Sequence, residues 1–492
     1  MKPLTIIAMY SREPHFEKTL LSLIESGLVE EILIVCPEMM GIKIPKCRIL
    51  TGTTLQSQKI LSQVINEANT GYLLFLTTIQ QITIEPGALE KLIKIAESTK
   101  AGIVYTDFYD EGVQGRVLHP LTDYQVGSVR DDFDFGGMMI FSTEAARGAL
   151  QKYGPIPSVD YAGLYDLRLK VSIDYPIYHL SKPLYSLAQP AGSSGDTRLF
   201  AYVDPRNAAV QKEMEIVFTD YLKKIGAYLP PDALKQAEQS RESFPVEASV
   251  VIPVRNRHGT IRDAVESALS QEADFPFNVI VVDNHSTDGT SDILFDLASK
   301  HPSLKHIIPE RTNLGIGGCW NEAINSKFCG RYAVQLDSDD LYSSSGAVRR
   351  IVDTLRDGKY AMVIGSYTIV NSKLDKIPPG LIDHQEWSDE NGHNNALRIN
   401  GLGAPRVFDT NIIRKIGFLN VSYGEDYAAA LRICREYRIG RIYDSLYLAR
   451  RWEGNTDAAL TIEETNRNNL FKDKIRTKEI IVRQKINKGV SM

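Results

Sequence analysis

The chain repeats itself at the scale of a whole domain. The stretch LTIIAMYSREPHFEKTLLSLIES near the N-terminus matches SVVIPVRNRHGTIRDAVESALSQ in the second half, because both are typical of a strand, a polar turn and an amphipathic helix. GYLLFLTTIQ and RYAVQLDSDD match in the same way and lie 260 residues apart. Further segments match in the same order along the chain. Self-similarity at this scale predicts two copies of one fold.

Strand and helix patterns alternate in both copies, which predicts an α/β fold with a mostly parallel sheet. We therefore expect two tandem Rossmann-like domains, each with a trailing helix. The linker between them is predicted from LPPDALKQAEQSRESFP, which is rich in proline and polar residues. The predicted limits are 1–203 for the first copy, 204–245 for a helical linker, 246–460 for the second copy and 461–492 for a C-terminal helix.

Composition narrows the classes of function. A chain of 492 residues with 43% hydrophobic and 24% charged residues can form two or three globular domains. Its net charge of −5 provides no basic field, so nucleic acid is not expected as a partner. No apolar run approaches the ~20 residues of a membrane helix, and the N-terminus lacks the features of a signal peptide. The five cysteines show no metal-ligand spacing, which favours reduced thiols in a cytoplasmic protein.

The two copies differ in charge where one strand ends. In RYAVQLDSDD the alternating strand residues are followed by Asp337, Asp339 and Asp340, whereas the first copy has TTI in place of DSD. The carboxyl ends of parallel strands face the ligand crevice of an α/β sheet. Carboxylates crowded there repel one another unless a cation or hydrogen-bond donors offset their charge. The first copy shows that the fold does not need this charge, so we predict that it serves chemistry in the second.

Other strand ends differ in the same direction. Asp283 in the second copy corresponds to Cys36 in the first. The match of EDYAAALR with YDLRLKVS places Asp426 opposite Asp166, which is the one carboxylate that both copies keep. These differences predict that the second copy is the catalytic half.

The second copy contains five motifs in chain order, which are SVVIPVRNRHGTIRDAVESALSQ, VIVVDNHSTDGT, NLGIGGCWNEAI, LDSDD and GED. Together, over residues 249–456, they resemble the nucleotide-sugar-dependent glycosyltransferases of family 2, which have the GT-A fold. The resemblance implies a GT-A domain preceded by a degenerate copy of itself. It also implies a nucleotide-sugar donor, with UDP favoured, Mg²⁺ or Mn²⁺ as cofactor, and inversion at the anomeric carbon. The implied acceptor is a glycan or glycolipid, in the assembly of a surface polysaccharide or another glycan.

The resemblance assigns the chemistry to two acidic motifs. Asp339 is expected to bind the cation, and Asp337 to bind the ribose, or the cation through water, because Mg²⁺ prefers hard oxygen ligands. Asp340 is expected to be a local capping carboxylate. Asp426 of GED is the expected general base for the acceptor hydroxyl, with Glu425 in a supporting or acceptor-binding role. Simple helix capping is the structural alternative for this pair.

The remaining expected contacts surround the nucleotide and the diphosphate. Asp283 can accept a hydrogen bond from the base or ribose, and Asn256 can both donate and accept one. The glycine-rich RTNLGIGG would let the backbone approach the nucleotide closely. Arg450 and Arg451 are expected at the departing diphosphate, and Trp452 as a platform for an acceptor sugar. The other expected donor-site residues are Pro253, Arg255, Asn313, Gly315 and Asn321.

Other classes of protein stay open at this point. A phosphatase of the haloacid type also places Asp-x-Asp after a strand, but near the start of its domain. A nucleotidyltransferase needs a glycine-rich, Arg-containing loop after its first strand, which PVRNRHGT does not supply. The further alternatives are an enzyme with both copies active and a non-enzymatic carbohydrate-binding scaffold.

The C-terminal segment NNLFKDKIRTKEIIVRQKINKG combines apolar and basic residues. We expect it to form a helix that packs on its own domain or on the other copy. Peripheral contact with an anionic membrane is the alternative, since basic amphipathic helices bind such surfaces. The oligomeric state is left open.

Overall fold

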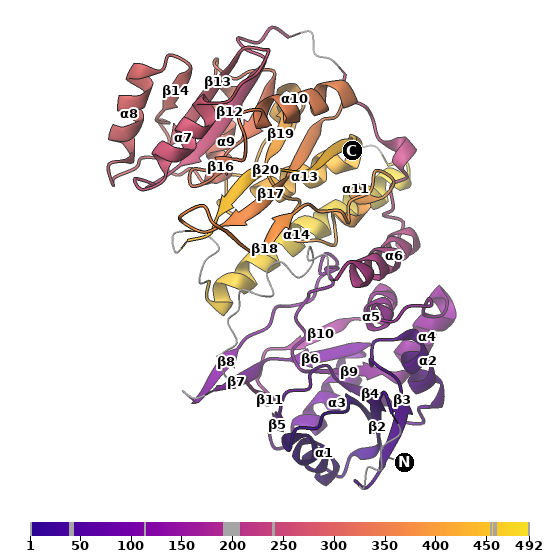
Figure 1. Ribbon diagram of the computed structural model, residues 1–492. Helices are drawn as coiled ribbons and strands as arrows, with labels where there is room; N and C mark the ends of the chain where they lie inside the picture. Colours follow the sequence, from indigo (N-terminus) through magenta and orange to yellow (C-terminus); the bar gives the residue numbers. More distant parts are fainter. Residues whose placement is uncertain are drawn as a thin grey trace. The chain divides into compact units, whose positions relative to one another are not determined.

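The computed structural model describes residues 2–38, 44–112, 115–189, 207–238, 242–452, 455 and 460–490. The chain divides into two compact units (Figure 1). Unit 1 comprises Met1–Leu199, Ala209–Tyr228 and Thr461–Gln484, and unit 2 comprises Phe200–Ala208, Leu229–Leu460 and Lys485–Met492. The predicted limit between residues 203 and 204 lies outside the described residues.

Unit 1 contains the first copy and is built from short strands and amphipathic helices. Its strands are β1 (Leu4–Met9), β2 (Val29–Cys36), β3 (Cys47–Thr51), β4 (Tyr72–Leu76), β5 (Ile82–Ile84), β6 (Ile103–Thr106), β7 (Phe108–Gly112), β8 (Gly115–His119), β9 (Met138–Ser142), β10 (Ile177–Leu180) and β11 (Tyr185–Ala188). Its helices are α1 (His15–Glu25), α2 (Gln58–Glu67), α3 (Ala88–Thr99), α4 (Thr143–Tyr153), α5 (Gly163–Asp174), α6 (Ala208–Lys224) and α14 (Ile462–Asn487).

Unit 2 contains the second copy. Its strands are β12 (Ala248–Val254), β13 (Phe277–Asp283), β14 (Leu304–Ile307), β15 (Tyr332–Gln335), β16 (Leu341–Tyr342), β17 (Met362–Val370), β18 (Lys376–Ile382), β19 (Arg406–Asp409) and β20 (Ile439–Arg450). Its helices are α7 (Ile261–Leu269), α8 (Thr290–Lys300), α9 (Ile316–Asn325), α10 (Ala347–Gly358), α11 (Gly392–Asn395), α12 (Thr410–Ile416) and α13 (Glu425–Glu436), after a short 3₁₀ turn at Pro231–Ala233.

The main sheets of the two units share one order of seven strands. The main sheet of unit 1 has the strand order β3-β2-β1-β4-β9-β6-β10, and unit 2 repeats it as β14-β13-β12-β15-β19-β17-β20. In each sheet one strand, β9 or β19, runs antiparallel to both of its neighbours, and the other pairs along this order are parallel. The mostly parallel α/β fold predicted from the sequence is therefore confirmed, and the first copy keeps it without the acidic motifs.

The core of unit 2 follows from the apolar strand residues. β12 and β13 are buried over almost their whole length, as expected for central parallel strands that helices cover on both faces. Helix α10 covers one part of this core, because Val348, Ile351, Val352 and Leu355 recur at helical spacing and are all buried. These strands fix the carboxyl edge at which the predicted site residues lie.

The C-terminal helix α14 belongs to unit 1 rather than to the second copy. Gly127 N donates to Thr477 Oγ1 at 2.8 Å, and Ser128 Oγ donates to Asp473 Oδ2 at 3.0 Å. A side chain at Gly127 would meet the Asp473 carbonyl oxygen at 2.0 Å, so the helix and this loop are in direct contact. Of the two packing partners expected from the sequence, the structure shows the other copy. Among the described residues, no helix is both long enough and apolar enough to cross a membrane.

Candidate active site

The acidic turn lies where the central strand β15 ends. β15 ends at Gln335, and the turn begins two residues later at Asp337, whose N–H donates to Tyr447 Oη on β20 at 2.9 Å. Tyr342 Oη in turn donates to the carbonyl oxygen of Gln335 at 2.9 Å. Two buried tyrosines therefore fix the backbone where the turn begins.

Each of the three carboxylates in the turn has hydrogen-bond donors of its own. Both oxygens of Asp337 accept from Gln335 Nε2, at 3.1 and 3.2 Å. Asp340 Oδ1 accepts from the backbone N–H of Arg450 at 2.7 Å. Asp339 Oδ2 accepts from Trp452 Nε1 at 3.0 Å, and Asn455 Nδ2 lies 3.3 Å from the same oxygen. The last residue of β20 thus binds Asp340, and the segment that follows β20 binds Asp339.

These donors do not offset the charge of the turn. Burial raises the pKa of Asp337, and the neighbouring charge of Asp339 adds to the rise. Burial likewise raises the pKa of Asp340 well above its ordinary value, with Asp337 and Asp339 contributing. A cation at the turn would reverse both effects.

The donor set of the turn fits a hard divalent cation. Within the described residues, Asp339 Oδ1 accepts no hydrogen bond, and a carboxylate oxygen is the ligand that Mg²⁺ prefers. The described part of the chain contains no cluster of three or more His, Cys, Asp or Glu side chains arranged around one point. The arrangement therefore suits an ion held by one or two carboxylates and by substrate phosphates rather than a complete protein cage.

The predicted base lies at the start of helix α13. Gly424, with φ of 78°, turns the chain into the helix, so Glu425 and Asp426 occupy its first turn, where the helix dipole favours negative charge. Asp426 Oδ2 lies 2.8 Å from Arg406 Nη2 on β19. Arg406 Nη1 also donates to Gln335 Oε1 at 3.1 Å. Two side chains therefore connect the acidic turn to the predicted base, and neither was predicted from the sequence.

Glu425 is an unusual carboxyl group. It is 8% exposed, and its Oε2 accepts no hydrogen bond from the residues that the structure describes. Burial, together with the charge of Asp426, raises the pKa of Glu425 to about 8. At neutral pH Glu425 is therefore mostly protonated.

The glycine-rich motif packs against protein rather than leaving an open surface. A Cβ at Gly315 would lie 2.5 Å from the backbone of Val421, and one at Gly317 would lie 1.9 Å from the carbonyl oxygen of Leu419. Gly317 N also donates to Val421 O at 3.0 Å. These glycines bring helix α9 against the segment that leads into Glu425, which is a structural reason for them that the sequence did not reveal.

Asn313 and Asn321 also make structural contacts. The carbonyl oxygen of Asn313 accepts from Asn420 Nδ2 at 3.1 Å. The Asn321 amide donates to the carbonyl oxygen of Phe418 at 2.9 Å and accepts from the N–H of the same residue at 2.9 Å. The partners of both residues, Asn420 and Phe418, lie on the segment before α13. This part of the motif therefore supports the predicted base.

On the nucleotide side, Asp283 is fully buried at the end of β13. It accepts from Ser286 N at 3.0 Å and from Ser291 Oγ at 2.5 Å, and His306 Nε2 lies 3.4 Å away. Burial alone would raise the pKa of Asp283, but these hydrogen bonds outweigh it and hold the pKa well below the ordinary value. Asp283 thus orders the turn after β13.

The neighbouring loop after β12 faces solvent. Asn256, with φ of 54°, accepts from Thr287 N at 2.8 Å, which joins this loop to the turn after β13. Arg255 is exposed, and Pro253 is half-buried at the end of β12. The structure therefore brings Pro253, Arg255 and Asn256 to the same edge as the acidic turn.

The two arginines at the end of β20, Arg450 within the strand and Arg451 directly after it, have different surroundings. Arg450 Nη2 lies 3.1 Å from Asp263 Oδ2 on α7 and its side chain is 6% exposed, whereas Arg451 N donates to Val370 O at 2.7 Å. The Arg257 guanidinium carbon lies 5.8 Å from the ring centroid of Trp452. Arg257 Nε also lies 3.8 Å from Asp339 Oδ2, so a third arginine, absent from the predicted set, belongs to this edge.

The structural register corrects one residue match between the copies. Helix α5 begins at Gly163 and α13 at Glu425, both helices are 12 residues long, and each is followed by a tyrosine in extended conformation. Asp426 therefore corresponds to Leu164, and not to Asp166 as the sequence match suggested. Asp166 lies two residues further into the helix, where it forms a buried ion pair with Lys170 at 2.7 Å.

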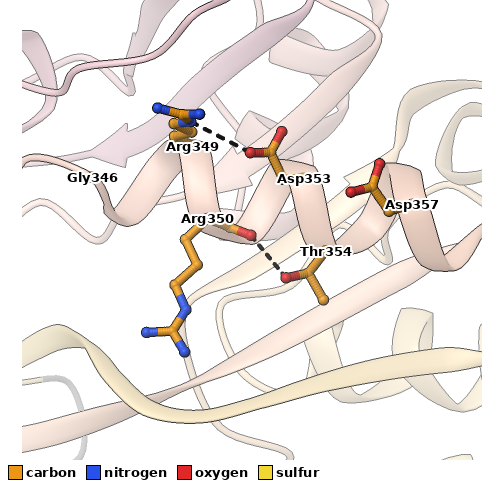
Figure 2. A pocket seen from close by; sticks show the side chains of 6 residues that line it. All are labelled: Gly346, Arg349, Arg350, Asp353, Thr354 and Asp357. Atoms are coloured by element: carbon orange, nitrogen blue, oxygen red, sulfur yellow. Dashed lines mark hydrogen bonds and ion pairs between the residues drawn. The ribbon is translucent and has the colours of Figure 1, made fainter.

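Two surface depressions of unit 2 lie apart from these residues. One, of about 350 Å³, lies along the outer face of α10 and is lined by Gly346, Arg349, Arg350, Asp353, Thr354 and Asp357 (Figure 2). Another, of about 460 Å³, includes Trp387, His393 and Arg438. Neither contains a residue of the predicted site.

Comparisons with known proteins agree with the geometry of unit 2. Residues 249–417 match the family model described as glycosyl transferase family 2. The poly(ribitol-phosphate) beta-glucosyltransferase of Bacillus spizizenii is 25% identical over 215 residues, which are 42% of this chain and 33% of that protein. The chondroitin synthase of Escherichia coli is 38% identical over 109 residues, which are 22% of this chain and 15% of that protein. The chain spans about a quarter of the length of an uncharacterized Mycobacterium tuberculosis protein that it also matches, at 30% identity.

Solved structures give low overall similarity. TarS of S. aureus, residues 1–349 with UDP-GlcNAc, has a TM-score of 0.37 at 21% identity, over 49% of this chain and 73% of that one. The mannosyltransferase PcManGT of Pyrobaculum calidifontis, with GDP-Man and Mn²⁺, has a TM-score of 0.35 at 15% identity, over 60% of this chain and 88% of that one. At these TM-scores the superpositions say nothing about function. The strand order of unit 2 and the match at residues 249–417 together identify this part of the chain as a family 2 glycosyl transferase domain of the GT-A fold.

Proposed function

We propose that unit 2 transfers a sugar from a nucleotide-sugar donor, with UDP favoured, to a hydroxyl group of a glycan or glycolipid acceptor. The observation that carries this proposal is the link between the acidic turn and Asp426 through Gln335 and Arg406 at one edge of the sheet. The family match supports the reaction class. The names of the relatives, a poly(ribitol-phosphate) glucosyltransferase and a chondroitin synthase, support an acceptor in polysaccharide assembly.

On this proposal Asp339 and Asp337 hold Mg²⁺ or Mn²⁺, which when bound offsets the charge of the departing diphosphate. Asp339 would bind the cation through Oδ1, and through Oδ2 as well once the contact with Trp452 is displaced, whereas Asp337 would act through water or at the ribose. Arg450 and Arg257 lie beside the turn and can contribute positive charge to the same group. Pro253, Arg255 and Asn256 of the loop after β12, together with Asp283, would surround the nucleotide.

Asp426 is the proposed general base. It takes the proton of the acceptor hydroxyl while the oxygen of that hydroxyl bonds to the anomeric carbon. The bond from that carbon to the diphosphate oxygen breaks at the same time, and the nucleoside diphosphate leaves with the bonding electrons. Attack from the side opposite the leaving group inverts the anomeric carbon. Glu425 is mostly protonated at pH 7, so it adds no negative charge beside the base.

Unit 1 is proposed to transfer no sugar. At the positions of Asp337 and Asp426 it has Thr77 and Leu164, so it lacks both a charged ligand and a base. Its proposed role is structural, or to position the acceptor. We retain the proposed domain limits of 1–203, 204–245, 246–460 and 461–492, and the C-terminal helix is now assigned to unit 1. The proposed location of the protein is the cytoplasm.

A panel of nucleotide sugars tests the proposed function. The whole chain is incubated with each donor, with Mn²⁺ or with EDTA, and release of nucleoside diphosphate is measured. We expect cation-dependent release from at least one donor, and loss of release in Asp339→Ala. Release that persists in EDTA would remove the cation from the proposal. A chain that hydrolyses no donor, and whose thermal midpoint no nucleoside diphosphate raises, would favour the carbohydrate-binding scaffold.

A further inference from the structure

Building on the proposed function, we propose that Arg406 and Gln335 are positioning residues that couple the proposed base Asp426 to the donor-side carboxylate Asp337. Arg406 lies on β19, and Gln335 is the last residue of β15, which is the neighbouring antiparallel strand. The coupling therefore runs across the sheet, from helix α13 to the acidic turn.

The contacts form one continuous chain of hydrogen bonds. Arg406 Nη2 lies 2.8 Å from Asp426 Oδ2, and Arg406 Nη1 donates to Gln335 Oε1 at 3.1 Å. Gln335 Nε2 then donates to both oxygens of Asp337, at 3.1 and 3.2 Å. Arg406 is 12% exposed at its side chain and Gln335 is 7% exposed, so water competes little for these bonds.

The chain has only one possible direction. A guanidinium group donates hydrogen bonds and accepts none, so Gln335 must turn its oxygen toward Arg406. The Gln335 amide group then faces Asp337, which as a carboxylate can accept from it. The hydrogen-bond chain thus has a carboxylate at each end, and the two groups between them can donate and accept only in this direction. A displacement of Asp337 when the donor binds will therefore move Gln335, and through it Arg406 and the bond to Asp426.

The first copy shows that these polar residues are not needed for the fold. In unit 1, Phe75 of β4 is paired with Met139 of β9 in the register that brings Gln335 and Arg406 together in unit 2. This register is secure because Ser142 and Asp409, which end the two strands, both cap the following helix. Unit 1 lacks the acidic turn and the base, and it forms the same sheet with two apolar residues at the positions of Gln335 and Arg406. The polar pair accompanies the proposed chemistry and not the architecture.

A lysine at position 406 separates the charge from the geometry. The ammonium group of lysine keeps the positive charge beside Asp426. It lacks the planar fork with which arginine binds two acceptors at fixed angles. Arg406→Lys should therefore break the coupling and leave the local charge unchanged.

A double-mutant cycle on the whole chain tests the coupling. The affinity for UDP with Mn²⁺ is measured by calorimetry for the wild type, Asp426→Ala, Gln335→Met and the double variant. The same four proteins are then made in the Arg406→Lys background. We expect the two substitutions to be non-additive by about threefold or more in Kd in the wild-type background. We expect them to be additive in the Arg406→Lys background, because the two residues then share no partner.

Arg356→Lys is the matched control. Arg356 also binds two acidic side chains, Asp353 and Asp357, but on the outer face of helix α10. The coupling must survive in this background. Additive effects in the wild-type background, or a coupling that persists in Arg406→Lys, would overturn the proposal.

Failure of the proposed function gives a different result. A wild-type chain that binds no UDP with Mn²⁺ would count against the favoured donor and not against the coupling. The same cycle is then measured on the midpoint of thermal unfolding, where the hydrogen-bond chain predicts non-additive shifts that disappear in Arg406→Lys. Additive shifts there would contradict the positioning pair.

Discussion

Trp452 Nε1 donates a hydrogen bond to Asp339 Oδ2 at 3.0 Å, so the carboxylate proposed to bind the cation is already engaged by an indole of the same chain. A hydrogen bond to a charged group contributes about 1.5–3 kcal/mol. A cation that used both oxygens of Asp339 would have to displace this bond. The contact therefore competes with cation binding in the structure described here, in addition to any role of Trp452 as a platform for a sugar.

Trp452→Phe should accordingly tighten the binding of Mn²⁺ in the presence of UDP. Phenylalanine keeps an aromatic ring for Arg257 to stack on but lacks the N–H group. We expect the Kd for Mn²⁺ to fall by about tenfold or more if the cation displaces this bond in the wild type, because about 1.4 kcal/mol corresponds to a factor of ten. Calorimetric titration of the whole chain measures it.

Trp387→Phe is the control for this experiment. Trp387 Nε1 is buried and has no hydrogen-bond partner in the described structure, so loss of its N–H breaks no bond. Its Mn²⁺ affinity should equal that of the wild type. Weaker Mn²⁺ binding in Trp452→Phe would show that Trp452 supports the cation site rather than competing with it.

Asp426→Asn should separate binding from catalysis. The amide oxygen of asparagine can still accept from Arg406, so the donor side is left intact, but the residue can no longer take a proton. We expect turnover to fall by about 10²-fold or more, with the affinity for UDP and Mn²⁺ unchanged. Asp339→Ala should lose both. Equal loss of nucleotide affinity in the two variants would contradict this division of roles.

Glu425 should make stability depend on pH. Its pKa rises from 4.5 to about 8 on folding, so the folded protein holds a proton that the unfolded chain releases between these values. The free energy of unfolding should therefore fall as pH rises from 4.5 to about 8, and the decline should stop above that pH. In Glu425→Gln this contribution is absent. Urea unfolding at pH 5 and pH 8 should show a smaller loss in the variant, and equal losses would refute the assignment.

The sequence predicted the sheet and the acidic turn because their signals are local. Alternating apolar residues identify the strand that ends at Gln335, and the carboxylates follow directly. Arg406 and Gln335 were missed because each resembles an ordinary strand residue, and 71 residues separate them along the chain. Only the pairing of β15 with β19 brings them together. Long-range contacts of this kind leave no pattern in a single sequence.

The residue match at α5 failed for a related reason. Both helices carry an aspartate near their start. Matching these two aspartates placed the sequence match two residues away from the structural register. The glycines of RTNLGIGG were interpreted as an approach to the nucleotide, because glycine shows that a close approach occurs but not what approaches. In unit 2 it is the backbone of Leu419 and Val421.

Removal of residues 461–492 should destabilise unit 1. Asp473 and Arg476 on α14 are fully buried, and Asp473 accepts from Ser128 and lies 3.5 Å from Arg130 Nε. The truncation would take this carboxylate away from the buried Arg130, which also forms an ion pair with Asp132, and removing one partner of a buried pair costs up to about 3–5 kcal/mol. Limited proteolysis should therefore cut unit 1 faster in the truncated chain, with unit 2 unchanged. Equal protection of unit 1 in both chains would contradict the packing of α14.

The central claim is that the second copy alone performs sugar transfer, and matched substitutions in the two copies test it most directly. Asp339 in the acidic turn corresponds to Ile79 in unit 1, which is 60% exposed. Turnover of the whole chain is measured for Asp339→Ala and for Ile79→Ala with the donor that the wild type uses. We predict that Asp339→Ala loses turnover by about 10²-fold or more, and that Ile79→Ala stays within about twofold of the wild type. Turnover that survives Asp339→Ala, or that falls with Ile79→Ala, would contradict the account.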